Sequence, residues 1–166
     1  MVAVALAEED PEVAFGDTLA RHGPVLLAAA RLITLDESEA QDVVQVTYEI
    51  ALRRGHTLRD PASLRAWLLA IATREAVKRV SSLRRFLSFS LHVHDVAAAE
   101  PSRDQSLALR DGLRKLPPRV RAAIALHYLE GYSVRETASA LGVSENTIKT
   151  QLKTGLSRLR EELRDG

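Results

Sequence analysis

Residues 131–163 read GYSVRETASALGVSENTIKTQLKTGLSRLREEL, and their pattern decides the fold. Ser133 is followed three residues later by Glu136, a capping box that predicts the start of a short helix. Gly142 can adopt a positive φ and Ser144 can cap a following helix, which predicts a tight turn between two helices. Aliphatic residues at spacings of three and four predict an inner face on the second helix: Ile148, Leu152, Leu156, Leu159 and Leu163.

The same stretch has the signals of a helix-turn-helix. Ala138, Gly142 and Ile148 supply the small residue that lets the helices approach, the turn glycine and the aliphatic residue between them. The outer face of the second helix is polar, and such side chains can reach base edges and phosphates in a major groove. We therefore expect a DNA-binding unit, with a purely structural helical hairpin as the alternative. The outward-facing residues are Glu145, Asn146, Lys149, Thr150 and Lys153.

Helical signals also fill the rest of the chain. Of the 166 residues, 46% are hydrophobic and only 8 are glycine, which fits an all-α protein better than a sheet. Upstream, helices are predicted over residues 17–33, from a capping box at residues 38–41 to Gly55, and from Pro61 to about Val80. Gly23 and Pro24 should kink the first of these. Downstream, a capping box at residues 102–105 starts a helix that ends at Pro117, and another follows to Glu130.

The helical pattern breaks between the two halves. Residues 86–91 alternate briefly like a strand, but a single strand without a partner is not stable, so this stretch is interpreted as a linker. The predicted fold is all-α, with two small helical domains joined by a flexible linker. Its boundaries are a disordered N-terminus over residues 1–11, a first domain over 12–85, the linker over 86–103 and a second domain over 104–164.

Charge is segregated along the chain although the net charge is only +1. Residues 8–49 carry ten acids and two arginines, whereas residues 53–85 carry nine bases and two acids. Such blocks suggest different partners on different faces, with an ordinary solvated helix surface as the alternative.

Several classes of protein are excluded by composition. The absence of cysteine excludes disulfides and cysteine nucleophiles, no apolar stretch approaches the ~20 residues that span a bilayer, and residues 1–7 lack the basic start of a signal peptide. We therefore expect a cytoplasmic protein without membrane insertion. His92 and His94 have no cysteine or clear carboxylate partner, so no metal site and no cofactor are predicted. We also find no nucleophile or phosphate-loop motif, and hence no enzyme active site.

Five short motifs, in this order, resemble the extracytoplasmic-function (group 4) sigma factors of bacterial RNA polymerase. Residues 39–47 (EAQDVVQVT) and 64–72 (LRAWLLAIA) are similar to region 2 of that family. Residues 113–119 (LRKLPPR), 128–131 (YLEG) and 142–150 (GVSENTIKT) are similar to its region 4. The resemblance covers about residues 12–163.

The resemblance implies three sets of functional residues. The first would bind core RNA polymerase, on the coiled coil of its large subunit, through Asp42, Gln45 and Glu49. The second would read and open the −10 promoter element through Arg59, Arg65, Trp67, Arg74, Lys78 and Arg79. The third would read the −35 element through Arg135, Ser144, Glu145, Asn146, Lys149, Thr150 and Lys153.

For Trp67, the spacing with neighbouring aliphatic residues favours core packing over stacking on a base. By family analogy an anti-sigma factor is a further partner. The alternative function is a free-standing helix-turn-helix regulator; a helical enzyme would need a site that the sequence does not offer.

Overall fold

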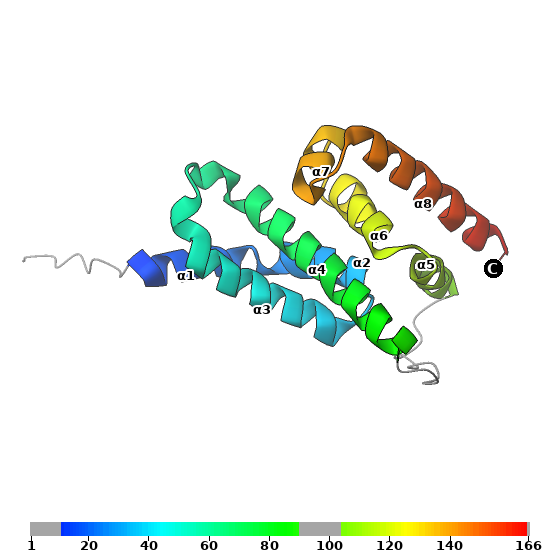
Figure 1. Cartoon of the computed structure of the whole chain (residues 1–166), viewed down its shortest axis with the longest axis horizontal. Helices are drawn as coiled ribbons and strands as arrows, with labels where there is room; N and C mark the ends of the chain where they lie inside the picture. Colours follow the sequence, from blue (N-terminus) through cyan, green and yellow to red (C-terminus); the bar gives the residue numbers. More distant parts are fainter. Residues whose placement is uncertain (1–10, 90–103, 166) are drawn as a thin grey trace, which may run out of the picture.

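The computed structural model describes residues 11–89 and 104–165, which form helices and turns without any strand (Figure 1). The first group of helices is α1 (Pro11–Arg21), α2 (Gly23–Thr34), α3 (Glu37–Arg54) and α4 (Leu64–Phe89), with two short 3₁₀ turns, η1 (Gly55–Thr57) and η2 (Pro61–Ser63). The second group is α5 (Asp104–Arg114), α6 (Pro118–Ile124), the π-helical turn η3 (Ala125–Leu129), α7 (Val134–Leu141) and α8 (Glu145–Asp165). The predicted all-α fold with two small helical domains is confirmed.

The N-terminal domain is a bundle in which α2, α3 and α4 pack against one another. Its centre is made of fully buried aliphatic side chains from all three helices, among them Leu26, Ile33, Val43, Leu68 and Leu69. Burying such side chains is the main favourable term in folding, so this shared core fixes the direction of α4.

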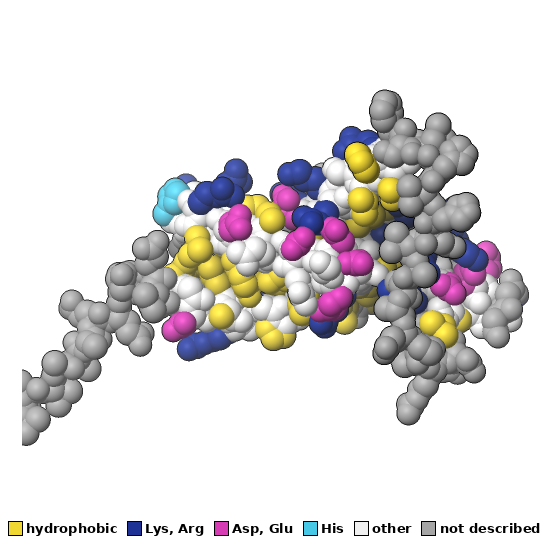
Figure 2. Space-filling view, turned by 90° about the horizontal axis from the view of Figure 1, so that it is seen from below, with side chains coloured by type: hydrophobic (Ala, Val, Ile, Leu, Met, Phe, Trp, Pro, Cys, Tyr) yellow, Lys and Arg dark blue, Asp and Glu magenta, His cyan; other side chains and the backbone are white. Residues whose placement is uncertain are grey.

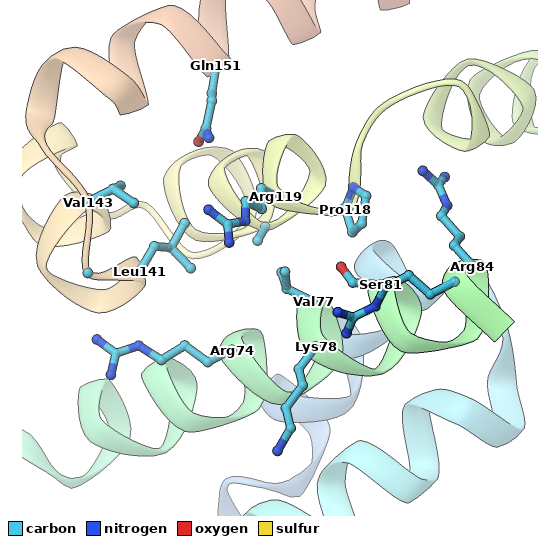
Figure 3. Close-up of a pocket in the computed structure, with 13 residues that line it drawn as sticks. Arg74, Val77, Lys78, Ser81, Arg84, Pro118, Arg119, Leu141, Val143 and Gln151 are labelled. Atoms are coloured by element: carbon cyan, nitrogen blue, oxygen red, sulfur yellow. The ribbon is translucent and has the colours of Figure 1, made fainter. Parts of the chain in front are cut away.

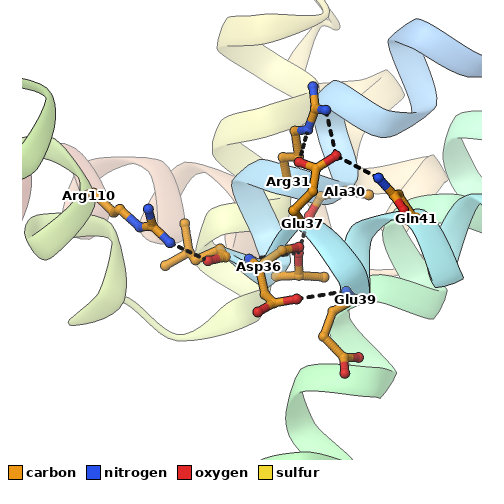
Figure 4. Close-up of polar contacts among 9 residues, drawn as sticks. Ala30, Arg31, Asp36, Glu37, Glu39, Gln41 and Arg110 are labelled. Atoms are coloured by element: carbon orange, nitrogen blue, oxygen red, sulfur yellow. Dashed lines mark hydrogen bonds and ion pairs between the residues drawn. The ribbon is translucent and has the colours of Figure 1, made fainter. Parts of the chain in front are cut away.

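Two predicted helix boundaries in this domain are wrong. The helix expected over residues 17–33 is not kinked but interrupted, because α1 ends at Arg21 and α2 begins at Gly23 with Pro24 in its first turn. The cap of α3 is Asp36, not Ser38: its carboxylate accepts a hydrogen bond from the backbone N–H of Glu39 at 2.8 Å (Figure 4). Both residues have the chemistry of a cap, and the left-handed turn at Leu35 places Asp36 first.

The helix α4 is longer than predicted. It begins at Leu64, directly after the 3₁₀ turn η2 that Asp60 caps, and it continues to Phe89 instead of ending near Val80. Residues 86–89, which the sequence assigned to the linker, thus form its last turn. Several predictions fall outside the described part of the chain. They concern residues 1–10, the linker over residues 90–103 with His92 and His94, and the first two residues of the capping box at residues 102–105.

The C-terminal domain packs α8 across α5, α6 and α7. The crossing with α6 is close because Gly155 has no side chain: a Cβ there would lie 2.8 Å from Cγ1 of Val120 and 3.0 Å from Cδ1 of Ile124. Ile148, Leu152 and Leu159 are buried as predicted, whereas Leu163, near the end of α8, is 47% exposed and does not belong to the inner face. Along the described residues, no helix combines the length and the apolar character that a membrane span requires.

The two domains share a packed boundary. Ala122, Ala125 and Leu126 from α6 and η3, together with Ala140 of α7, belong to the same buried cluster as the core of the N-terminal domain. Small residues allow α6 to lie directly against α2 and α4. The sequence did not predict this contact, and it determines which faces of α4 remain free.

Candidate nucleic-acid interface

The helix-turn-helix has the geometry that its sequence predicts. The hydroxyl of Ser133 accepts a hydrogen bond from the backbone N–H of Glu136, whose carboxylate accepts one from the N–H of Ser133, at 3.1 and 2.8 Å. Gly142 ends α7 in the left-handed conformation, with φ of 67°. Ser144 then caps α8 by accepting from the backbone N–H of Thr147 at 3.1 Å.

The predicted −35-binding residues are all exposed: six lie at the cap and in the first turns of α8, and Arg135 lies in the first turn of α7. Apart from the capping bonds of Ser144, their side chains have no hydrogen-bond or ion-pair partner within the described residues, so they are free to meet a ligand. The exposed residues are Arg135, Ser144, Glu145, Asn146, Lys149, Thr150 and Lys153. The N-terminus of α8 also lies here, where backbone N–H groups and the helix dipole favour a phosphate.

The predicted −10-binding residues on α4 are arranged differently, because two of them contact the C-terminal domain. A guanidinium nitrogen of Arg65 lies 2.5 Å from the carboxylate of Glu130, whose side chain is only 5% exposed. Arg74 donates to the backbone carbonyls of Ala140 at 2.7 Å and Ser139 at 3.3 Å, at the end of α7. Cations at the C-terminus of a helix meet its partial negative charge, so this contact is favourable.

The other members of the −10 set have different surroundings. Arg59 is exposed just before η2, and Lys78 is exposed with Nζ 3.7 Å from the Glu75 carboxylate. Trp67 is half-buried and packs against the N-terminal core, in agreement with the packing that its spacing favours. Arg79 forms ion pairs with Glu39 and, at 2.5 Å, with Asp42.

The predicted core-binding residues lie together along α3. Asp42, Gln45 and Glu49 are all exposed, and Gln45 donates to the Glu49 carboxylate at 3.5 Å. Figure 2 looks at the molecule from the side of α3 and shows acidic and basic side chains gathered next to exposed apolar surface. The Asp42–Arg79 pair joins a residue predicted to bind polymerase to one predicted to bind the −10 element.

Sequence reasoning missed the polar residues that join the domains. Arg121 is 2% exposed and donates to the carbonyls of Ile33, Leu116 and Leu113 at 2.7, 2.8 and 3.2 Å. Arg110 donates to the carbonyl of Leu35 at 2.9 Å (Figure 4). The signal available for Arg121 was a lone charge inside the apolar run at residues 120–126.

Burial lowers the pKa of Arg121 to about 10, and the nearby charge of Arg84 acts in the same direction. The guanidinium therefore stays protonated at neutral pH, and backbone carbonyls rather than a carboxylate compensate its charge. The described residues contain no group of three or more His, Asp or Glu side chains placed to hold a metal ion.

Comparison with known proteins identifies the family. The sigma-70 region 2 family matches residues 18–86, and the sigma-70 region 4 family matches residues 106–159. The RNA polymerase sigma-E factor of Streptomyces coelicolor is 34% identical over 140 residues, which cover 83% of this chain and 79% of the relative. The extracytoplasmic-function (ECF) sigma factor SigX of Bacillus subtilis is 30% identical over 77% of this chain and 72% of its own length.

Solved structures agree with these relatives. The sigma factor RpoE of Bartonella quintana, in complex with the anti-sigma factor NepR, has a TM-score of 0.74 and 26% identity over 91% of this chain and 97% of its own. CnrH, in complex with the cytosolic domain of CnrY, has a TM-score of 0.65 and 29% identity, and the match covers 92% of this chain and 89% of CnrH. Matches to both region 2 and region 4 do not favour a free-standing regulator. The chain belongs to the ECF sigma factors, the family of promoter-specificity subunits that direct bacterial RNA polymerase to its start sites.

Proposed function

We propose that this group 4 sigma factor divides promoter recognition between its domains, with the −35 element read by α7 and α8 and the −10 element by the loop before η2 and by α4. The observation that carries the proposal is the free polar surface at the start of α8, which displays Lys149, Thr150 and Lys153 beside a helix N-terminus. Such a surface suits a major groove, where side chains reach base edges and the helix end meets a phosphate.

Core RNA polymerase would bind the α3 face of the N-terminal domain. Asp42, Gln45 and Glu49 line an exposed acidic and polar strip of one helix, which suits a helical partner such as the coiled coil of the large subunit. In this complex the chain acts where RNA polymerase acts, in the cytoplasm. Because Asp42 forms an ion pair with Arg79, binding of polymerase at Asp42 would also compete with this ion pair of Arg79 on α4.

Binding of the −10 element requires the C-terminal domain to leave α4. In the packed arrangement Arg65 donates to Glu130, and Arg74 donates to carbonyls at the end of α7. A DNA phosphate would compete for the same guanidinium groups. The packed arrangement is thus a resting state in which promoter affinity is low, and core polymerase would favour the separated domains. Since the two similar solved structures are complexes of RpoE with NepR and of CnrH with CnrY, an anti-sigma factor that stabilises the packed arrangement is a natural regulator.

Transcription with purified core polymerase tests the division of labour. Lys149→Ala combined with Lys153→Ala should lower initiation at a duplex promoter by about tenfold or more, since each lost contact is worth roughly 1–3 kcal/mol. Initiation on a template whose −10 region is already unpaired and which lacks a −35 element should be unchanged.

The matched control is Arg158→Ala combined with Arg164→Ala, which removes the same charge from exposed positions elsewhere on α8. Initiation by this control variant should stay near the wild-type level on both templates. Failure of the wild-type chain to start transcription with core on any genomic fragment would overturn the function, and equal losses on the two templates would overturn the division.

A further inference from the structure

A cleft of about 740 Å³ lies between the two domains. One wall is α4. The other wall is formed by α6, by α8 and by the turn that joins α7 to α8 (Figure 3). Cationic residues of both domains line it, and among the described residues no acidic side chain does. Lys78 points away from α6 (Figure 3), and the Arg74 guanidinium is hydrogen-bonded to the end of α7. The cations are Arg74, Lys78, Arg84, Arg85 and Arg119.

The positive charge of this cleft is poorly compensated. Neither Arg84 nor Arg119 has a side-chain partner among the described residues, and Arg85 makes only a 3.5 Å contact with the Ser82 hydroxyl. The guanidinium of Arg84 also acts on the buried Arg121, since its charge helps to lower the pKa of that residue. Like charges held together repel one another, and a bound anion would offset this repulsion.

The remaining lining is mostly apolar, with the polar side chain of Ser81 and one acceptor that has no hydrogen-bond partner among the described residues. Val77, Pro118, Leu141 and Val143 form the apolar part of the walls. Gln151 extends from α8 toward the cleft (Figure 3), and its Oε1 atom is buried without any hydrogen-bond partner. A buried acceptor without a donor costs free energy, so a ligand that supplies an N–H group would be favoured here.

We propose that the cleft binds a nucleoside polyphosphate, with the phosphates on Arg84, Arg85 and Arg119 and the base on the apolar wall beside Gln151. The volume lies within the roughly 300–1,000 Å³ typical of small-molecule sites. Guanidinium groups bind phosphate oxygens in bidentate geometry, and an exocyclic amino group of the base can donate to Gln151 Oε1. Because the ligand touches both domains, its binding stabilises their packed arrangement.

Calorimetric titration of the full chain with ATP, GTP, AMP and pyrophosphate tests this site. A nucleoside triphosphate should bind with a stoichiometry of one, and AMP should bind at least about tenfold more weakly because it lacks the charge-assisted contacts of the outer phosphates. Gln151→Leu should reduce the advantage of the triphosphate over pyrophosphate, while pyrophosphate binding itself is retained.

Arg84→Ala combined with Arg119→Ala should weaken triphosphate binding by about tenfold or more, and both positions are exposed, so the fold should persist. The matched control is Arg53→Ala combined with Arg54→Ala, which removes the same charge at the exposed end of α3. Saturating triphosphate should also slow amide hydrogen exchange in both α4 and α7.

Three results would overturn the proposal. The first is absence of binding at millimolar nucleotide, and the second is an equal loss of affinity in the control variant, which would mean attraction to net charge alone. The third is an Arg84- and Arg119-dependent affinity for a single-stranded oligonucleotide that nucleotides do not compete for, which would assign the cleft to DNA.

Discussion

Nε of Arg121, in α6, lies 2.7 Å from the carbonyl oxygen of Ile33, in α2, and so joins the centre of one domain to the other. A second nitrogen of the same guanidinium donates to the carbonyls of Leu113 and Leu116. All three carbonyls stand at or near helix C-termini, where backbone partial charges are negative. The protein therefore holds a buried cation at its domain boundary with backbone acceptors instead of a carboxylate.

Arg121→Met tests this contact. The substitution fills part of the space but removes the guanidinium donor from three carbonyl oxygens. The Leu113 carbonyl keeps the Leu116 N–H as a donor at 3.0 Å, so the loss falls mainly on the carbonyls of Ile33 and Leu116. We expect the free energy of unfolding to fall by about 2–4 kcal/mol. Urea denaturation measures the change. Arg110→Ala, which loses a single bond to Leu35, should cost about 1 kcal/mol. If Arg121→Met were as stable as the wild type, the guanidinium would not hold the boundary together.

Gly155→Ala tests the close crossing of α8 over α6. Alanine is favoured over glycine in a helix by up to about 1 kcal/mol, but its Cβ would collide with Val120 and Ile124. Overpacking of this kind costs roughly 1–3 kcal/mol, so the net effect should be destabilising. Val120→Ala should relieve the collision, and the double variant should then be more stable than the sum of the single changes. A Gly155→Ala protein of raised thermal stability would contradict the packing described.

Glu136→Gln isolates the charge in the capping box of α7. The Ser133 backbone N–H, followed by the Ser133 side chain, holds the pKa of Glu136 below its ordinary value. The charge therefore stabilises the fold above the ordinary pKa of about 4.3, and this contribution disappears as the pH falls through the lowered folded pKa. The stability difference between wild type and variant should be present at neutral pH and should shrink in acid. Thermal melts across this range measure it, and a difference that grows in acid would reverse the assigned sign.

The sequence predicted best what local signals determine. Ser133, Glu136, Gly142 and Ser144 act on backbone groups within four residues of themselves, so the helix-turn-helix and its exposed surface follow from short-range chemistry. The order of the region 2 and region 4 motifs similarly indicated the family. The start of α3 could not be predicted from local signals alone. Asp36 and Ser38 are both good capping residues, and the left-handed turn at Leu35 makes Asp36 the cap.

The contacts between the domains could not be predicted in the same way. Arg65 and Glu130 are 65 residues apart, and Arg121 and Ile33 are 88 apart, so no periodicity connects them. Arg74 illustrates the consequence for function, because its place on α4 is consistent with a DNA contact while its hydrogen bonds go to the end of α7. Exposed residues of α8 need no such partner, and their accessibility was therefore predictable.

In the proposed mechanism, the packed domains separate before α4 can bind the −10 element. The chain has no cysteine, so Ala20→Cys and Ser157→Cys, at exposed positions on α1 and α8, allow a single pair of nitroxide labels. Distances between the labels can be measured by pulsed electron paramagnetic resonance in the free chain and in its complex with core polymerase and promoter DNA. We predict one narrow distribution in the free chain and a clearly longer distance in the promoter complex; the same distance in both states would contradict the account.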